Sequence, residues 1–182
     1  RNIGLQLLRS AFLFAATYTF FTAISRMDIA AATAVMQVHP MLLMLGAAIV
    51  LREGLGPRRI LGIVAALTGA LIVIRPGSEV FTPAALLPLL AGLFYASYAL
   101  ATRFLGRDEP IMTSFLYTAI IGTLVASAMT VPVWQAPLAW DWAMFLLLGV
   151  IGATGQFLLI RSLTIAEAGA VAPFSYAGVI FA

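Results

Sequence analysis

Long apolar stretches separated by short polar connectors make up almost the whole chain. An α-helix rises about 1.5 Å per residue, so about 20 apolar residues cross the roughly 30 Å hydrocarbon layer of a bilayer. Charges, prolines and glycines divide the sequence into seven such stretches, at residues 5–24, 29–51, 60–74, 84–101, 111–133, 142–160 and 168–182. The pattern predicts an all-α integral membrane protein, a transmembrane bundle with about seven helices present.

The composition supports a membrane protein and excludes several other classes. Hydrophobic residues make up 63% of the 182 residues and charged residues only 9%, a balance that a soluble fold of this size cannot bury. A net charge of +3, scattered along the chain, does not suggest a nucleic-acid partner. The chain contains no cysteine, so thiolate metal sites are excluded, and we expect no cofactor.

The arginines predict how the bundle sits in the membrane. Consecutive spans alternate in direction, so each connector lies on one of two faces. Eight of the ten arginines fall on one face (Arg1, Arg9, Arg52, Arg58, Arg59, Arg103, Arg107 and Arg161), and Arg26 and Arg75 fall on the other. Positive residues favour the cytoplasmic side. We therefore predict an inner-membrane protein with the loop from Arg52 to Arg59 in the cytoplasm.

A weak internal repeat appears when the chain is compared with itself at a shift of 139 residues. The segment SRMDIAAA (25–32) then falls on TIAEAGAV (164–171), which matches a hydroxyl residue, an acid three positions later and a run of small residues. The first and sixth spans, which correspond under this shift, run in opposite directions. Inverted repeats are typical of secondary transporters, because two such copies generate inward-open and outward-open states.

Several segments resemble the drug/metabolite transporter superfamily, and specifically its EamA-type transporters. The resemblance rests on AISRMDIAAATAVMQVHPMLLML, on LREGL, on RRILGIVAALTGALIVIRPG and, near the end, on IRSLTIAEAGAVAPFSYAGVIFA. It implies ten helices in two inverted five-helix repeats. Residues 1–79 would be the last three spans of the first repeat, and residues 80–182 four spans of a truncated second repeat. The chain also starts without a methionine and stops inside an apolar run, so we expect a fragment covering helices three to nine.

The resemblance also implies a function. EamA-type proteins move small organic metabolites or drugs by alternating access, commonly as exporters or exchangers. We therefore expect a secondary active transporter whose partners are a small organic solute, the lipid bilayer, and either protons or a counter-substrate. It would act as a monomer or homodimer and would not be an enzyme.

The centre of the second span carries polar groups where a purely apolar helix would suffice. Thr33 and Gln37 lie one turn apart on one face, and Pro40 follows three residues later. Proline cannot donate to the Met36 carbonyl, which would leave a free acceptor beside Gln37 and a hinge in the helix. Alternatively, Gln37 bonds a neighbouring helix and Pro40 only shapes packing.

His39, the only histidine, lies in the middle of the same span. Histidine is the side chain that ordinarily titrates near neutral pH, so His39 is a candidate for coupling protons to transport. All seven acids lie in connectors or at span ends, which leaves His39 without an obvious acidic partner. It also lies about 200° around the helix from Gln37. The alternative is a neutral, hydrogen-bonded packing residue.

Other mid-span polar residues are further candidates for the lining of a substrate cavity. Tyr176 falls on Gln37 under the repeat shift, which predicts that the two face each other across the pseudo-axis. Tyr18, Tyr95 and Gln156 complete the set of cavity candidates. For each tyrosine the alternative is a ring that packs in the bundle and bonds a neighbour.

Charged residues at the span ends favour structural roles. Asp28 begins a span, where the helix dipole stabilises a negative side chain. Glu53, beside Arg52 in the connector, resembles an acid common in this family and is a gate candidate; the alternative is a solvated surface pair. Arg9 lies just inside the first span, where we expect it to snorkel to the cytoplasmic headgroups, with binding of a substrate anion as the alternative.

Competing classes fit the sequence less well. An intramembrane enzyme needs two mid-span acids, a histidine-rich metal cluster or a serine with a base, and one histidine does not provide this. A channel needs a ring of charges or carbonyls. A non-transporting structural or assembly subunit of a membrane complex predicts neither an internal repeat nor a polar cavity, and it remains the alternative function.

Overall fold

The computed structural model describes residues 2–52, 54, 56–74, 83–106 and 109–175, and all regular structure within them is helical. The elements are α1 (Ile3–Ile24), α2 (Ile29–Met36), α3 (His39–Val50), α4 (Pro57–Ile74), η1 (Pro83–Ala85), α5 (Leu86–Leu105), α6 (Ile111–Thr130), η2 (Val131–Val133), α7 (Ala139–Ile165) and α8 (Ala168–Val171). The predicted all-α class is confirmed.

The helix boundaries follow the apolar stretches of the sequence closely. Five segments of the described residues are long and apolar enough to cross a membrane, at Ile3–Ile24, Ile29–Val50, Pro83–Leu105, Ile111–Val133 and Ala139–Ile165. α4 adds a further helix of 18 residues. Two helices extend clearly past their predicted ends: α5 continues to Leu105 and α7 to Ile165, so Arg103 and Arg161 lie within helices and not in connectors.

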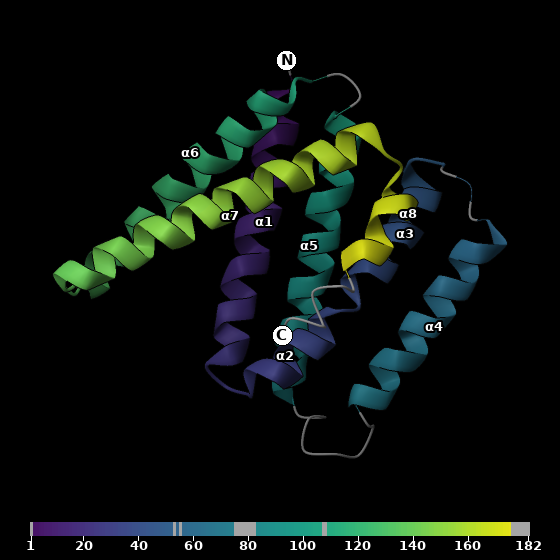
Figure 1. Cartoon of the computed structure of the whole chain (residues 1–182), viewed down its shortest axis with the longest axis horizontal. Helices are drawn as coiled ribbons and strands as arrows, with labels where there is room; N and C mark the ends of the chain where they lie inside the picture. The colour runs from purple at the N-terminus through teal and green to yellow at the C-terminus, as the bar shows by residue number, and fades with distance from the viewer. Residues whose placement is uncertain (1, 53, 55, 75–82, 107–108, 176–182) are drawn as a thin grey trace.

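The bundle is organised around α5, which packs along α1 on one side and against α3 on another (Figure 1). Small residues make these contacts close, because α5 buries Ala91, Gly92, Ala96 and Ala99. α6 and α7 run side by side and extend away from α1, as Figure 1 shows. The centre of the molecule is therefore α5, with α1, α3 and α7 packed against it and α6 packed against α1 and α7.

The outer surface is apolar, as expected of a bundle in contact with lipid. Leu146 and Leu148 on α7 are 71% and 65% exposed, and large apolar side chains are exposed on the other long helices as well. Exposed apolar surface of this extent is unfavourable in water but is the normal exterior of a membrane protein. The chain is a multi-pass membrane protein.

Candidate functional site

The second predicted span is interrupted at its centre. Asp28 caps α2, since its carboxylate accepts hydrogen bonds from the backbone N–H groups of Ala30 (2.8 Å) and Ala31 (3.3 Å). α2 ends at Met36, and α3 begins at His39 with Pro40 in its first turn. Proline is well tolerated at a helix start, where its missing N–H would have no helical partner. The span is thus two short helices joined at Gln37 and Val38.

The Met36 carbonyl at this break is not free, contrary to the expectation from the sequence. The His39 ring nitrogen Nδ1 lies 3.1 Å from the Met36 oxygen. Since a carbonyl oxygen only accepts, Nδ1 carries the hydrogen of this bond. His39 itself is buried, with 7% of its surface exposed. Its ring therefore satisfies the acceptor that Pro40 leaves unpaired.

Gly92 of α5 lies directly against the break. A Cβ atom added at Gly92 would lie 3.1 Å from the Met36 oxygen and 3.2 Å from Cγ1 of Val38. Only glycine lets the α5 backbone approach so closely without displacing these atoms. In the sequence, Gly92 is a lone glycine inside an apolar stretch, which gives no signal of this contact.

A row of three aromatic rings leads from the break into the bundle, which we call the aromatic row: His39, Tyr95 and Tyr98. The His39 and Tyr95 rings meet edge to face, with their centroids 4.9 Å apart. Tyr95 and Tyr98 follow at 5.9 Å, and Tyr98 is completely buried. Two of the predicted candidates, His39 and Tyr95, are therefore in contact. Tyr98, a mid-span tyrosine that the sequence also places in an apolar stretch, is the third member.

Tyr98 connects the aromatic row to a group of polar side chains around Arg9, the arginine cluster: Arg9, Tyr98, Thr102, Ser114 and Thr118. The Arg9 guanidinium carbon lies 5.4 Å from the centroid of the Tyr98 ring, within cation–π range. Its nitrogens donate to the Thr102 hydroxyl at 3.3 Å, to the Ser114 carbonyl and to the Thr118 hydroxyl. The cluster joins α1 to α5 and α6.

The position of Arg9 corrects the expectation that it snorkels to the headgroups. None of its surface is exposed, and its hydrogen-bond partners lie on neighbouring helices. The sequence carried a signal for this: Ala16 and Ala23 follow at intervals of seven residues and are also buried. Residues seven apart share a helix face, so Arg9 belongs to the buried face of α1.

Gln156 of α7 completes the contacts, since its Nε2 donates to the Tyr98 hydroxyl. Gln156 is a predicted cavity candidate, and Tyr98 brings it into one connected group with Tyr95 and His39. Helices α1, α3, α5, α6 and α7 all contribute side chains to this group. We call the aromatic row, the arginine cluster and Gln156 together the polar core.

The other predicted residues lie outside these contacts. Gln37 donates a long hydrogen bond, 3.5 Å, to the Ser175 carbonyl. Ser175 precedes Tyr176 in the sequence, but Gln37 makes no hydrogen bond to the polar core. The Thr33 hydroxyl donates to Ile29 of its own helix at 2.7 Å. Tyr18 is 53% exposed and stacks on Phe14. Tyr176 and Glu53 lie outside the residues that the structure describes.

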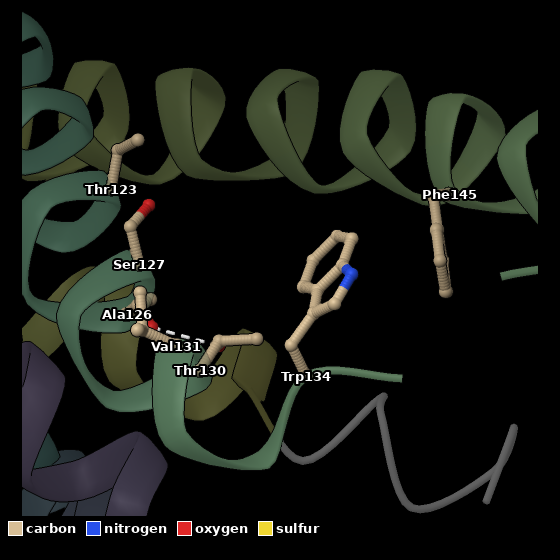
Figure 2. A pocket seen from close by; sticks show the side chains of 7 residues that line it. All are labelled: Thr123, Ala126, Ser127, Thr130, Val131, Trp134 and Phe145. Atoms are coloured by element: carbon tan, nitrogen blue, oxygen red, sulfur yellow. Dashed lines mark hydrogen bonds between the residues drawn. The ribbon is translucent and has the colours of Figure 1, made fainter. Parts of the chain in front are cut away.

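A separate groove lies between α6 and α7, away from all of these candidates. Its volume is about 1190 Å³. Figure 2 shows the side chains that line it: Thr123, Ala126, Ser127, Thr130, Val131, Trp134 and Phe145. The Thr130 hydroxyl on its wall already donates to the Ala126 carbonyl at 2.8 Å (Figure 2). The groove is mainly apolar and offers no ionisable side chain, so the polar core is the stronger candidate site.

Fold and site together define a class: a multi-pass helical membrane protein with a buried polar centre where several helices meet. More specifically, the chain belongs to the EamA-like transporter family, which matches residues 1–75 and 82–182. This confirms the resemblance predicted from the sequence, and the expectation that the chain is not an enzyme. No solved structure matches the chain.

Several named transporters are similar to the chain. The riboflavin transporter of Brucella anthropi is 28% identical over 95% of this chain and 63% of its own length. The S-adenosylmethionine uptake transporter of Rickettsia prowazekii is 23% identical over 94% of this chain and 58% of its own length. The pseudopaline exporter CntI of Pseudomonas aeruginosa is 27% identical, over 89% and 58% respectively. The chain thus spans about three fifths of the length of these relatives.

Proposed function

We propose that the protein is a secondary active transporter that moves a small organic solute across the inner membrane by alternating access, as an exporter or an exchanger. The observation that carries the proposal is the polar core. It joins side chains of α1 and α3, from the first predicted repeat, to side chains of α5, α6 and α7 of the second, and Arg9, Tyr98 and Thr102 at its centre are buried. Ionisable and polar side chains inside a membrane bundle are costly and typically mark a transport pathway.

The helix break supports alternating access by providing a hinge. Interrupted helices are common in transporters, because the unwound backbone and helix ends face the substrate site. Here the break at Gln37 and Val38 lies beside His39 at one end of the aromatic row. We propose that α3 tilts about Pro40 against α5, with Gln37, Thr33, Tyr18 and Tyr176 contributing to the cavity in other states.

We propose that the solute is a planar heteroaromatic molecule. The aromatic row and the Phe12–Phe94 stack nearby offer rings on which such a molecule can stack. Riboflavin and S-adenosylmethionine, the solutes named for two relatives, both contain heteroaromatic rings. Transport would be driven by protons through His39, or by a counter-substrate.

The decisive experiment reconstitutes the complete gene product that contains this chain into proteoliposomes. Movement of riboflavin and of S-adenosylmethionine is measured in both directions, with and without an imposed proton gradient and with each solute preloaded inside. We expect movement of at least one solute, accelerated by the gradient or by the preloaded solute. If neither solute moves under any condition, with correctly folded protein in the vesicles, the proposal is wrong. Net flow from outside to inside only would refute export and exchange.

Variants of predicted cavity residues test the site separately from the activity. Gln37→Ala and Tyr95→Ala should each lower transport at least several-fold while the protein still reaches the membrane, since both remove a proposed contact with solute. Leu146→Ala, on the exposed surface of α7, is the matched control and should transport normally. Normal transport by Gln37→Ala would remove Gln37 from the site.

The orientation is tested by labelling of single introduced cysteines, because this chain has no cysteine of its own. We propose that the connector containing Gly56, together with the gate candidate Glu53, lies in the cytoplasm, as its arginines favour. A cysteine introduced by Gly56→Cys should resist a membrane-impermeant thiol reagent in intact cells and react after lysis. One introduced by Ala136→Cys, in the connector between α6 and α7, should react in intact cells. The reverse pattern would invert the topology.

A further inference from the structure

We propose that Arg9 binds the anionic group, a carboxylate or a phosphate, of the transported solute. This inference rests on the proposed function and adds the chemical class of one part of the substrate. The site is the buried polar face of α1 at Gln6, Arg9 and Ser10, where it meets α5 and α6.

The first observation is a buried positive charge that no negative charge balances. All of the hydrogen-bond partners of Arg9 are neutral, namely the hydroxyls of two threonines and of Tyr98 and one carbonyl oxygen. The Tyr98 ring also lies within cation–π range of the guanidinium. Among the described residues, no carboxylate pairs with Arg9. Burying a charge without a counter-charge is strongly unfavourable. A solute anion would supply the missing charge.

The second observation is that polar atoms on this face are buried without a partner. Arg9 Nε, the Ser10 hydroxyl and Gln6 Oε1 make no hydrogen bond, although all three residues are at least 97% buried. Residues 6, 9 and 10 lie three and four apart, so they share one side of α1. The Nε–H and the hydroxyl are both donors, which a carboxylate or phosphate requires, and guanidinium groups bind these anions through two parallel hydrogen bonds.

The third observation is that Arg9 can leave its present partners at little cost to them. The Thr102 hydroxyl also donates to the Tyr98 carbonyl at 2.8 Å, and the Thr118 hydroxyl to the Ser114 carbonyl at 2.9 Å. Both hydroxyls therefore keep a bond within their own helix when the arginine moves. As α1 separates from α5 and α6, the guanidinium exchanges neutral acceptors for the solute anion.

A purely structural role for Arg9 predicts no preference for an anionic solute. Pairs of probes that differ by one anionic group therefore separate a structural role from anion binding. Flavin mononucleotide adds a phosphate to riboflavin, and S-adenosylmethionine carries a carboxylate that its decarboxylated form lacks. Binding of all four to the purified complete gene product in detergent is measured by microscale thermophoresis. We expect the wild type to bind the anionic member of at least one pair tenfold or more tightly than its partner. No such preference in either pair would overturn the proposal.

Variants then assign the preference to Arg9. Arg9→Gln should abolish the preference, because it should weaken binding of the anionic probe at least tenfold and leave binding of the uncharged or decarboxylated probe almost unchanged. Arg9→Lys should keep part of the preference. Ser10→Ala should weaken the anionic probe several-fold without lowering the melting temperature, since that hydroxyl has no partner to lose. Ser97→Ala, whose hydroxyl bonds only its own helix, is the control.

The outcomes separate this inference from the proposed function. An unchanged preference in Arg9→Gln, or an equal loss for both members of a pair, would show that Arg9 does not bind the anion. Should Arg9→Gln fail to fold, an unchanged preference in Ser10→Ala would overturn the site equally. An Arg9-dependent preference in a protein that moves no solute in proteoliposomes would support the anion site and refute the transporter.

Discussion

The buried face of α1 changes its chemistry halfway along the helix. In the N-terminal half it consists of Gln6, Arg9 and Ser10, which meet hydroxyl and carbonyl groups of α5 and α6. In the C-terminal half it consists of Ala16 and Ala23, which are 2% and 0% exposed. The alanine half depends on shape, because only a small side chain allows such close packing. The polar half depends on hydrogen bonds, which other partners can replace.

This difference suggests a division of labour during transport. A small-residue contact gains its stability from complementary surfaces, so any enlargement is unfavourable in every state. A polar contact can exchange one set of partners for another at little net cost. We therefore expect the alanine half of α1 to stay packed and the polar half to open.

The largest effect on stability is expected from enlarging the alanine half. Ala23→Leu places three more carbon atoms where no surface is exposed, and overpacking of this kind costs about 1–3 kcal/mol. The thermal unfolding midpoint in detergent should fall clearly. Ala11→Leu, the same change at an exposed position of the same helix, is the control and should change the midpoint little. Equal midpoints for the two variants would show that the alanine half is not tightly packed.

A smaller effect is expected in the polar half from Tyr98→Phe. The change keeps the ring beside Tyr95 and Arg9 but removes the hydroxyl, which accepts from Gln156 and also bonds the Arg9 and Thr102 side chains. Hydrogen bonds between membrane helices contribute about 0.6 kcal/mol on average and about 1.7 kcal/mol at most, and the loss should lie in this range. Reversible unfolding in mixed micelles measures it.

A double-mutant cycle with Gln156→Leu tests whether this loss comes from the pair. The double variant should be less destabilised than the sum of the single variants, because it leaves no buried amide unpaired. Tyr18→Phe, at an exposed tyrosine, should have no measurable effect. If the two single losses add up to the loss in the double variant, the hydrogen bond between Gln156 and Tyr98 contributes nothing to stability.

The sequence predicted elements more completely than contacts, and α1 and α5 show why. Helix boundaries depend on local apolar length and on connectors, so most boundaries of the first six spans were predicted to within a few residues. Arg9 was misplaced because the length of its side chain allows either snorkelling or burial, and the choice depends on neighbouring helices. Only the spacing of Arg9 with Ala16 and Ala23 indicated its buried face.

The candidate site was predicted in part for the same reason. His39, Tyr95 and Gln156 stand out as polar groups in apolar stretches, and the polar core contains all three. Tyr98 is a mid-span polar residue of the same kind as Tyr95 and Tyr117, and nothing in the sequence marks it as the residue that joins the others. Its importance arises from the packing of α5 against α1 and α7, which no local pattern encodes.

The smallest expected effect concerns whether close packing extends to the helix break. Alanine normally stabilises a helix interior by about 0.5–1 kcal/mol relative to glycine. At Gly92 the added Cβ would lie 3.1 Å from the Met36 carbonyl oxygen, a backbone atom that cannot move aside freely. The two effects oppose each other, so Gly92→Ala should leave stability unchanged or slightly lower. Gly122→Ala on α6, where no atom lies within 4 Å of the new Cβ, should raise the free energy of unfolding by the full helix stabilisation. Equal gains for both variants, measured by unfolding in mixed micelles, would mean that the break does not rest against α5, and the hinge proposed at Pro40 would lose its support.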